Sequence, residues 1–290
     1  MTLDIATRFR PLFMPKTVAV VGVSRSGAGQ GNRFIRALKA AQFEGAIYPI
    51  HNSEATLEGL PAYRSLADTP EPVDYAYVAV KAEDVAPLVA GAGGRVRYAQ
   101  VMSGGFAEAE GGADLEAGLL SAARKAGIRL LGPNCMGTHS PRGRLTFLPD
   151  APLDAGSTAV LSQSGGLSMD ILRRGPRVGL TFSALVSLGH CADLGVCDLL
   201  EYFLQDAETR TIGLYVENVK DGRRLFDFLR SAGARKPVVI LKGGRSRQGQ
   251  RAAASRQKLS KALRTTSSSS AAPRGKPSRR ARASSTSRGK

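Results

Sequence analysis

The chain has 290 residues, of which 42% are apolar, and a formal net charge of +17. This length has room for about two globular domains. No run approaches the roughly 18 apolar residues of a membrane-spanning helix, and the N-terminus MTLDIATRFRPLF lacks the apolar centre of a signal peptide. Three cysteines without a CxxC pair and three scattered histidines argue against a disulfide scaffold or a zinc site. We therefore expect a soluble, cytoplasmic protein without a metal centre or a membrane partner.

The basic charge is concentrated near the C-terminus. Residues 251–290 hold 12 of the 41 Lys and Arg residues and none of the 24 Asp and Glu residues. The remainder, with 29 basic and 24 acidic residues, has a net charge of only +5. The charge therefore does not indicate a nucleic-acid-binding surface on the folded part. An alternative function is weak, salt-dependent binding of nucleic acid by the tail, but we do not expect specific binding.

Short apolar runs alternate with amphipathic stretches over the first half of the chain. Apolar residues at helical spacing predict helices over residues 31–43, 82–92 and 113–127. The predicted strands are TVAVVGVS (17–24), GAIYPI (45–50), VDYAYVAV (73–80), VRYAQVM (96–102) and IRLLGPN (128–134). Nearly continuous apolar strands with helices between them predict a parallel sheet covered on both faces.

A second unit of the same kind follows a connection over residues 140–157, which is rich in Pro, Gly and Asp. The sequence predicts strands starting at residues 158, 180, 211 and 237, and helices over residues 166–175, 196–206 and 221–233. Residues 264–290 contain little that can be buried, so we expect disorder there. The predicted organisation is an α/β domain at 1–145, a second α/β domain at 146–255 and a disordered basic tail at 256–290.

A glycine-rich segment, VVGVSRSGAGQGN (20–32), joins the first predicted strand to the first predicted helix. Glycine lets the backbone approach a ligand closely, and a helix N-terminus favours phosphate. The segment matches neither GxGxxG in its usual register nor a GxxxxGK(S/T) P-loop. It favours a nucleotide-like ligand near Gly22, Gly27, Gly29 and Gly31; the alternative is an ordinary tight turn.

Two further loops follow predicted strands. LLGPNCMG (130–137) indicates a rigid turn, and no histidine is tied by sequence to Cys135, so we do not expect this thiol to be a nucleophile. VLSQSGGLSMD (160–170) offers free N–H groups and hydroxyls for an anion at a helix start. The anion candidates are Ser162, Ser164, Gly165 and Gly166. Simple N-capping is the alternative, and the loop differs from GxSxG because Ser162 stands where glycine is required.

Two further candidate site features lie near the ends of strands predicted in the second half of the chain. His190, Cys191, Asp193 and Cys197 look like metal ligands, but C-x5-C with one histidine is not a standard zinc pattern, so we expect a structural loop. Glu217 ends an otherwise apolar strand, where its carboxylate is placed to enter a site. The alternative is a solvated acid.

Six stretches together resemble one family, the NDP-forming acyl-CoA synthetases, which include ADP-forming acetate–CoA ligase and are related to the α subunit of succinyl-CoA synthetase. The stretches are FMPKTVAVVGVS, LLGPNCMG, VLSQSGGLSMDIL, SLGHCADLGVCDLLEYFLQD, LYVENVKDGRRLFDFLR and KPVVILKGGRSRQGQRAAAS. They cover roughly residues 8–255. The resemblance implies a Rossmann-like CoA-binding domain followed by a flavodoxin-like domain of the succinyl-CoA-synthetase type. It also implies the reaction acyl-CoA + ADP + phosphate ⇌ acid + CoA + ATP, through an acyl phosphate and a phosphorylated histidine.

The resemblance also implies residue roles. Glu217 matches the acid that orients the phosphohistidine, which would fix the tautomer of an attacking imidazole. Lys81 stands where proline is usual and would meet a CoA phosphate. The implied CoA-binding residues are Gly22, Ser24, Gly27 and Gly31, the implied phosphate-binding residues are Ser162, Ser164, Gly165 and Gly166, and the implied pocket lining is Pro133, Asn134 and Cys135.

The chain departs from the family pattern at several positions. His51, Asn52 and Ser53 replace the usual NPK, and GHCAD replaces GNKAD. The phosphorylated histidine normally lies in ASHTG, whereas this chain has ASRQK with Arg256 at that position. A guanidinium stays protonated and offers no nucleophilic lone pair. The ATP-grasp domain or β subunit that handles ADP or ATP with Mg is not found in the chain either.

These departures lead to a first hypothesis of a CoA- or acyl-CoA-binding protein that lacks the phosphorylation step. The alternative is a working ligase α subunit that acts with a separate ATP-grasp β subunit, and the family also associates into oligomers. A frameshift near residue 256 would explain the Arg-, Ser- and Ala-rich residues that follow. Translating the gene in its other two frames tests this, since an HTG motif in a shifted frame would support it.

Overall fold

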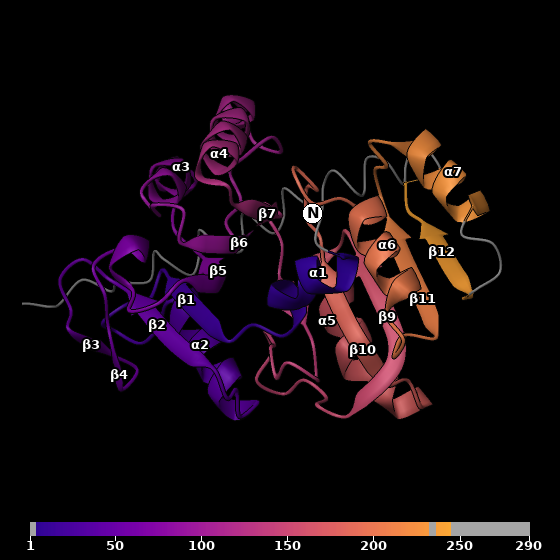
Figure 1. Cartoon of the computed structure of the whole chain (residues 1–290), viewed down its shortest axis with the longest axis horizontal. Helices are drawn as coiled ribbons and strands as arrows, with labels where there is room; N and C mark the ends of the chain where they lie inside the picture. Colours follow the sequence, from indigo (N-terminus) through magenta and orange to yellow (C-terminus); the bar gives the residue numbers. More distant parts are fainter. Residues whose placement is uncertain (1–3, 232–235, 245–290) are drawn as a thin grey trace, which may run out of the picture.

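The computed structural model describes residues 4–231 and 236–244, which form two α/β domains side by side (Figure 1). The first domain is built on a five-stranded sheet in the order β2-β1-β5-β6-β7, in which every pairing is parallel. Its strands are β1 (Thr17–Val21), β2 (Ala46–Ile50), β5 (Val73–Val78), β6 (Val96–Val101) and β7 (Arg129–Leu131). Its connecting helices are α2 (Gln30–Ala40), α3 (Ala82–Ala90) and α4 (Gly112–Ala126). The predicted parallel sheet is thereby confirmed.

The second domain has a sheet in the order β12-β11-β9-β10-β8. Four of its strands are parallel, and β8 (Gly137–His139) pairs antiparallel with β10 at one edge. The other strands and helices are β9 (Ala155–Ser162), α5 (Gly165–Arg174), β10 (Phe182–Ser187), α6 (Val196–Gln205), β11 (Thr211–Val216), α7 (Gly222–Ser231) and β12 (Val238–Lys242). Because β8 precedes residue 146, this sheet takes a strand from the range predicted for the first domain.

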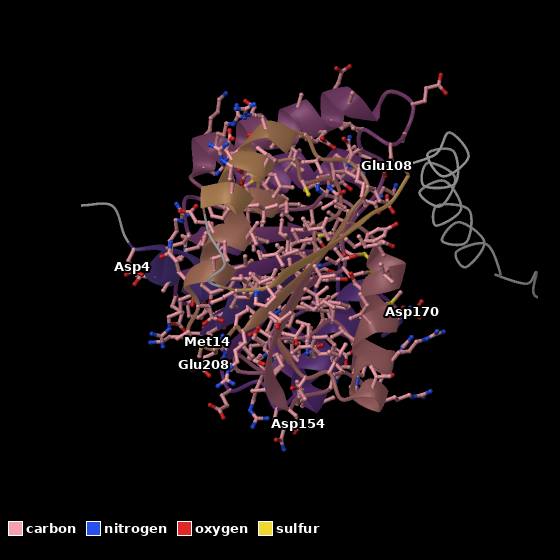
Figure 2. All side chains as sticks on the ribbon, turned by 90° about the vertical axis from the view of Figure 1, so that its right-hand side faces the viewer. Asp4, Met14, Glu108, Asp154, Asp170 and Glu208 are labelled. Atoms are coloured by element: carbon pink, nitrogen blue, oxygen red, sulfur yellow. The ribbon has the colours of Figure 1, made fainter. Side chains whose placement is uncertain are left out.

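Alternating side chains of the first sheet fill two separate cores. Val18 and Val20 of β1 join the core beneath α2, whereas Ala19 and Val21 join the core beneath α3 and α4. Successive side chains of a strand point to opposite faces, so a strand buried on both sides must be apolar throughout. The charged side chains of Asp4, Asp154, Asp170 and Glu208 lie on the outside of the molecule (Figure 2).

Several elements were not predicted from the sequence. They are the helix α1 (Ile5–Phe13), the hairpin of β3 (Thr56–Leu57) and β4 (Leu60–Pro61), the strand β8, and the 3-10 turns η1 (Leu66–Asp68) and η2 (Gly175–Val178). Each strand is only two or three residues long, and α1 contains Pro11, which normally disfavours a helix interior. Asp4 caps α1 by accepting a hydrogen bond from the Thr7 amide at 3.0 Å.

Helix α1 packs against both domains. The Phe13 ring stacks on Tyr202 of α6 with centroids 4.6 Å apart and meets Phe203 edge-on at 5.1 Å. The ring centroids of Phe9 and Tyr98 of β6 lie 6.1 Å apart, and the Tyr98 hydroxyl donates to the Arg8 carbonyl at 2.7 Å. The apolar face of α1 therefore helps to make one continuous core from the two domains.

Each sheet has a position where the chain's winding reverses direction, and ligands of open α/β sheets bind at the carboxyl ends of strands there. In the first sheet this position lies between β1 and β5. In the second it lies between β9 and β11. The glycine-rich loop follows β1, and the Ser162–Gly166 loop and Glu217 follow β9 and β11, so the predicted site loops flank these two positions.

No helix in the described part of the chain is long and apolar enough to span a bilayer. The predicted tail at 256–290 and Arg256 lie outside the described residues.

Truncating Phe13 tests the role of α1. We expect Phe13→Ala to lower the free energy of unfolding by about 3–5 kcal/mol, because the ring is 2% exposed and its removal leaves a cavity between α1 and α6. The matched control is Met14→Ala at the neighbouring residue, which is 38% exposed and should change stability by less than about 0.5 kcal/mol. Urea unfolding measures both; equal effects of the two variants would contradict the packing role of α1.

Candidate functional site

The glycine-rich loop runs from the end of β1 to the start of α2. Gly22 has φ +92°, and a Cβ there would overlap the carbonyl oxygen of Ala79, so this position requires glycine. Gly29 is the N-cap of α2, and the Gly31 amide donates to the Gly22 carbonyl at 3.2 Å. The loop thus folds tightly over the first turn of the helix, where unpaired amides favour an anion.

The side chain of Asn32 holds this loop from inside. Its Oδ1 accepts the Ser24 amide at 2.8 Å, and its Nδ2 donates to the Ser24 carbonyl at 3.0 Å and to Glu58 at 2.7 Å. Asn32 is 1% exposed, so every polar atom of its amide is used in the interior. The Ser24 hydroxyl is also engaged, because it accepts the Gly29 amide at 3.0 Å.

Glu58 lies in the turn of the β3–β4 hairpin and connects that hairpin to α2. Its carboxylate accepts hydrogen bonds from Arg36 at 2.6 and 3.0 Å besides the bond from Asn32. Burial opposes its charge, but the hydrogen bonds from Arg36 and Asn32 outweigh burial and lower the pKa of Glu58. The unpredicted hairpin therefore supplies the anchor of the predicted loop.

The loop after β7 is rigid and meets the second domain. The Gly132–Pro133 peptide bond is cis, and Asn134 has φ +56°. Cys135 is 3% exposed, its Sγ contacts the carbonyl oxygens of Val101 and Leu131 at 3.5 Å, and burial raises the pKa of its thiol. A buried thiol with a raised pKa is a poor nucleophile, in agreement with the expectation of a fixed loop. The Cys135 side chain lies in the core.

Residues 189–193 of the second domain, the GHCAD segment, run along this loop. The amides of His190, Ala192 and Leu194 donate to the carbonyls of Pro133, Gly132 and Leu130 at 3.0, 3.0 and 3.1 Å. A Cβ on Gly189 would overlap the Pro133 carbonyl oxygen. Backbone hydrogen bonds therefore join the two domains directly beside the predicted site.

Asp193 reinforces the same junction. Its carboxylate accepts the Leu130 amide at 2.7 Å and pairs with Arg129 at 2.9 Å. The expectation that Asp193 belongs to a structural loop fits these contacts. No group of three or more His, Cys, Asp or Glu side chains within residues 4–231 and 236–244 could hold a metal ion.

The serine loop after β9 is an ordered helix start. Ser164 is the N-cap of α5 and accepts the Leu167 amide at 3.3 Å. The Ser162 hydroxyl donates to the Ser164 carbonyl at 3.0 Å and accepts the Ser164 amide at 3.1 Å, and Ser162 is fully buried. N-capping by Ser164 is thus present, whereas the anion-binding role predicted for Ser162, Ser164, Gly165 and Gly166 stays a prediction.

Gln163, which sequence reasoning missed, joins the two strands that flank the second reversal point. Its Oε1 accepts the amides of Glu217 and Asn218 at 2.6 and 2.8 Å, and its Nε2 donates to the Asn218 carbonyl at 2.7 Å. The end of β11 is therefore held to the end of β9. Glu217 is half-buried there, and its Oε1 accepts the Tyr215 hydroxyl at 3.1 Å.

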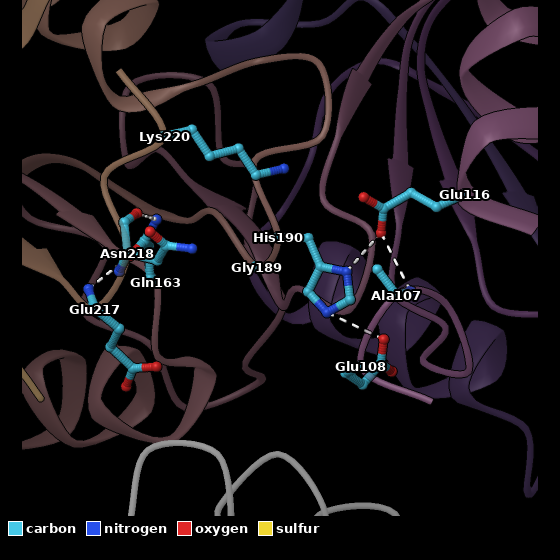
Figure 3. Close-up of a pocket in the computed structure, with 9 residues that line it drawn as sticks. All are labelled: Ala107, Glu108, Glu116, Gln163, Gly189, His190, Glu217, Asn218 and Lys220. Carbon is cyan, nitrogen blue, oxygen red and sulfur yellow. Dashed lines mark hydrogen bonds and ion pairs between the residues drawn. The ribbon is translucent and has the colours of Figure 1, made fainter. Parts of the chain in front are cut away.

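A pocket of about 210 Å³ lies between the two domains, with Glu217 in its lining. Figure 3 shows Gln163, Glu217 and Asn218 on one side and His190 with Glu108 and Glu116 on the other. The remaining lining residues are Ala107, Gly189 and Lys220. The two acids come from the segment after β6 and from α4, so the pocket has a wall from each domain.

His190 is enclosed by the two acids. Its Nδ1 lies 2.8 Å from Glu116 Oε2, and its Nε2 lies 3.1 Å from Glu108 Oε2. Burial opposes the charged imidazole, but the two carboxylates outweigh burial and raise the pKa of His190. Burial would raise the pKa of Glu108, but its contact with His190 and the hydrogen bond from the Gly105 amide lower it to about 2.

Each of the three histidines is engaged through at least one ring nitrogen. Both ring nitrogens of His190 face carboxylates. His139 is fully buried with its pKa lowered to about 4 by burial, and its Nδ1 contacts the Thr146 hydroxyl at 3.1 Å. His51 Nδ1 accepts the amides of Ser53 and Glu54 at 3.3 and 3.2 Å.

The predicted site residues form two groups. Gly22, Ser24, Gly27, Gly31 and the exposed Lys81 lie at the reversal point of the first sheet, and Ser162–Gly166 and Glu217 lie at that of the second. Pro133 and Asn134 join the first domain to the GHCAD segment. Sequence reasoning missed Asn32, Glu58, Gln163 and the two acids beside His190. The Gly-Asn pair that opens the predicted helix at residue 31 was the one local signal, and no sequence pattern connects the two acids to His190.

Profiles of two domain families match the chain. The CoA binding domain matches residues 16–141, and the succinyl-CoA ligase like flavodoxin domain matches residues 155–270. The second match extends past Arg256, where the resemblance was expected to end. The fold and these matches define a CoA-ligase type of protein with its CoA-binding and flavodoxin-like domains in tandem.

Curated relatives support the same assignment. ADP-forming acetate–CoA ligase I of Archaeoglobus fulgidus is 40% identical over 248 residues, covering 84% of this chain and 36% of the relative. The α subunit of ADP-forming acetate–CoA ligase I of Pyrococcus furiosus is 37% identical over 252 residues, covering 84% of this chain and 54% of the relative. The chain therefore spans between about a third and about half of the length of these relatives.

Solved structures support the same family assignment. The dinucleotide-forming acetyl-coenzyme A synthetase 1 of Ca. Korarchaeum cryptofilum, in complex with phosphate and ADP, has a TM-score of 0.78 and 35% identity. The match covers 86% of this chain and 55% of that one. The chain belongs to the NDP-forming acyl-CoA synthetase family.

Replacing Asn32 tests the network under the glycine loop. We expect Asn32→Asp to lower the free energy of unfolding by about 2 kcal/mol, because it removes two donors and sets a second buried carboxylate beside Glu58. Asn52→Asp, at an exposed residue, makes the same chemical change and should stay within about 0.5 kcal/mol. Urea denaturation of both variants measures the difference; a tolerated Asn32→Asp would show that the amide does not hold the loop.

Proposed function

We propose that the chain is the CoA- or acyl-CoA-binding part of an NDP-forming acyl-CoA synthetase. The observation that carries this proposal is the placement of the glycine loop and Lys81 on either side of the reversal point of the first sheet. Phosphate groups bind at helix N-termini approached by a glycine backbone. The family membership and the match to a CoA binding domain support the same ligand.

In the first domain, the loop from Gly22 to Gly31 would hold CoA through its backbone. Asn32 and the Ser24 hydroxyl are occupied inside the loop, so they would shape it while the amides at the start of α2 face a phosphate. Lys81, at the N-cap of α3, would add a cation beside the same phosphates. Pro133 and Asn134 would complete the wall toward the second domain.

In the second domain, the start of α5 and Glu217 would form the phosphate site. Ser164 caps the helix, and Gly165 and Gly166 occupy its first turn, where an anion is favoured. Glu217, which lines the pocket, would orient an imidazole introduced there. The reaction in which these groups would act is the exchange of acyl-CoA, ADP and phosphate for acid, CoA and ATP.

The phosphorylation step is proposed to be missing. Arg256 replaces the histidine that the family phosphorylates, and it cannot serve as a nucleophile. His139 is fully buried, both ring nitrogens of His190 face carboxylates, and none of the three histidines lies in a stretch that matches ASHTG. ADP or ATP, with Mg, would then be handled by an ATP-grasp partner, and acyl-CoA turnover would not be completed by this chain.

Calorimetry with CoA tests the binding function. We expect saturable binding, and we expect Lys81→Ala to weaken it by about three- to tenfold, more at low salt, because one phosphate-facing charge is lost. Lys125→Ala removes another exposed charge, at the C-terminal end of α4, and should leave the affinity unchanged. Absence of binding at millimolar CoA would overturn the proposal.

Mixing the chain with the β subunit of an ADP-forming acetate–CoA ligase tests the missing step. We expect no acid-, CoA- and ATP-dependent turnover and no transfer of labelled phosphate to the chain. Arg256→His is the informative variant, since it restores an imidazole that could accept phosphate. Turnover by the unaltered mixture would instead favour the alternative of a working α subunit.

A further inference from the structure

The contact between His190 and the two acids crosses from one domain to the other. His190 belongs to the loop after β10 in the second domain, whereas Glu108 and Glu116 belong to the first. The three side chains are only 9%, 10% and 12% exposed. This cluster is separate from the glycine loop and from the start of α5.

The cluster depends on the charge of the imidazole. Glu108 Oε2 and His190 Nε2 are buried and lack a well-aligned hydrogen bond, although they lie 3.1 Å apart, so their attraction is mainly one of charge. A neutral imidazole would leave a buried carboxylate without a counter-charge, which is costly in a protein interior. Glu217 lies across the same pocket and adds a third carboxylate to its lining.

The backbone of the same residue also fastens the domains. The His190 amide donates to Pro133, and the Ala192 and Leu194 amides continue the contact along residues 130–132. The side chain and the backbone of His190 therefore both contact the first domain.

We propose that protonated His190 is a positioning residue that fastens the CoA-binding domain to the second domain and so sets the width of the pocket facing Glu217. Loss of its proton loosens the junction. The fastening does not require the proposed function, whereas its effect on an acyl-CoA in the pocket rests on that function.

The direction of the pH dependence follows from the two titrating groups. A pKa raised above the ordinary value of about 6.5 means that the His190 contribution is complete below that pH and is lost as pH rises through the raised pKa. Glu108, with a pKa of about 2, stays ionised throughout this range. The other titratable side chains around the imidazole are Glu116 on α4, Lys220 and Glu217 across the pocket, and the adjacent Cys191.

Hydrogen exchange of the complete chain tests the proposal without a ligand. Protection factors of the Ala192 and Leu194 amides, corrected for intrinsic exchange, are compared at pH 6 and pH 9 with those of Val20 inside β1. We expect protection of the two junction amides to fall at least tenfold relative to Val20 as pH rises. A constant ratio in the wild type would overturn the proposal, and this measurement needs no variant.

Variants separate His190 from other titrating groups. His190→Asn should lower junction protection at pH 6 and abolish its change between pH 6 and pH 9. Glu108→Gln should reduce both, because Glu116 Oε2 still lies 2.8 Å from His190 Nδ1. The control His51→Asn removes a histidine outside the pocket and should keep the wild-type profile. A wild-type pH profile in His190→Asn would overturn the proposal, and Glu108→Gln decides it if that variant does not fold.

CoA titration at the same two pH values separates the two proposals. If the wild type binds CoA, we expect its affinity to fall between pH 6 and pH 9 together with junction protection. We expect the same fall in His51→Asn and no fall in His190→Asn. Absence of CoA binding with the protection change intact would contradict the proposed function alone. CoA binding with unchanged protection would contradict the fastening alone.

Discussion

Backbone hydrogen bonds between residues 190–194 and residues 130–133 connect the two domains at the point where their site loops meet. The contact is short, but both segments are fixed: one contains a cis Gly132–Pro133 bond, and the other is anchored through Asp193 to Arg129. Because these bonds place the loop after β10 against the loop after β7, they determine what faces Glu217 across the pocket. The position of His190 between two acids is a consequence of the same contact.

The two sheets share one local arrangement near their reversal points. In each, the winding reverses beside the first strand of its parallel set, and an amide side chain near that point binds backbone groups of a loop. Asn32 does this beneath the glycine loop, and Gln163 does it between β9 and β11. Both side chains use their donors and their acceptor at once, so neither a carboxylate nor an apolar residue could replace them without leaving backbone groups unpaired.

Helix α1 adds the apolar part of the junction. Its phenylalanines lie against aromatic rings of both β6 and α6, so the two halves share a core instead of meeting only through polar loops. The polar cluster at His190 and the apolar contact of α1 hold the domains in different ways: the first depends on protonation, whereas the second depends on buried area. A change of pH would therefore act on the pocket side of the junction while leaving the aromatic contact in place.

The sequence by itself determined the two α/β domains, the parallel strands, the strand-end positions of the candidate loops and the family, because these depend on local periodicity and on contiguous motifs. It did not determine α1 or the antiparallel β8, which are stabilised by partners far along the chain, or the β3–β4 hairpin, whose strands have only two residues each. Nor did it determine that Glu58 anchors the glycine loop, or that Glu108 and Glu116 enclose His190. These contacts join residues 22 to 82 positions apart, and only the tertiary structure decides which charges lie within reach of one another.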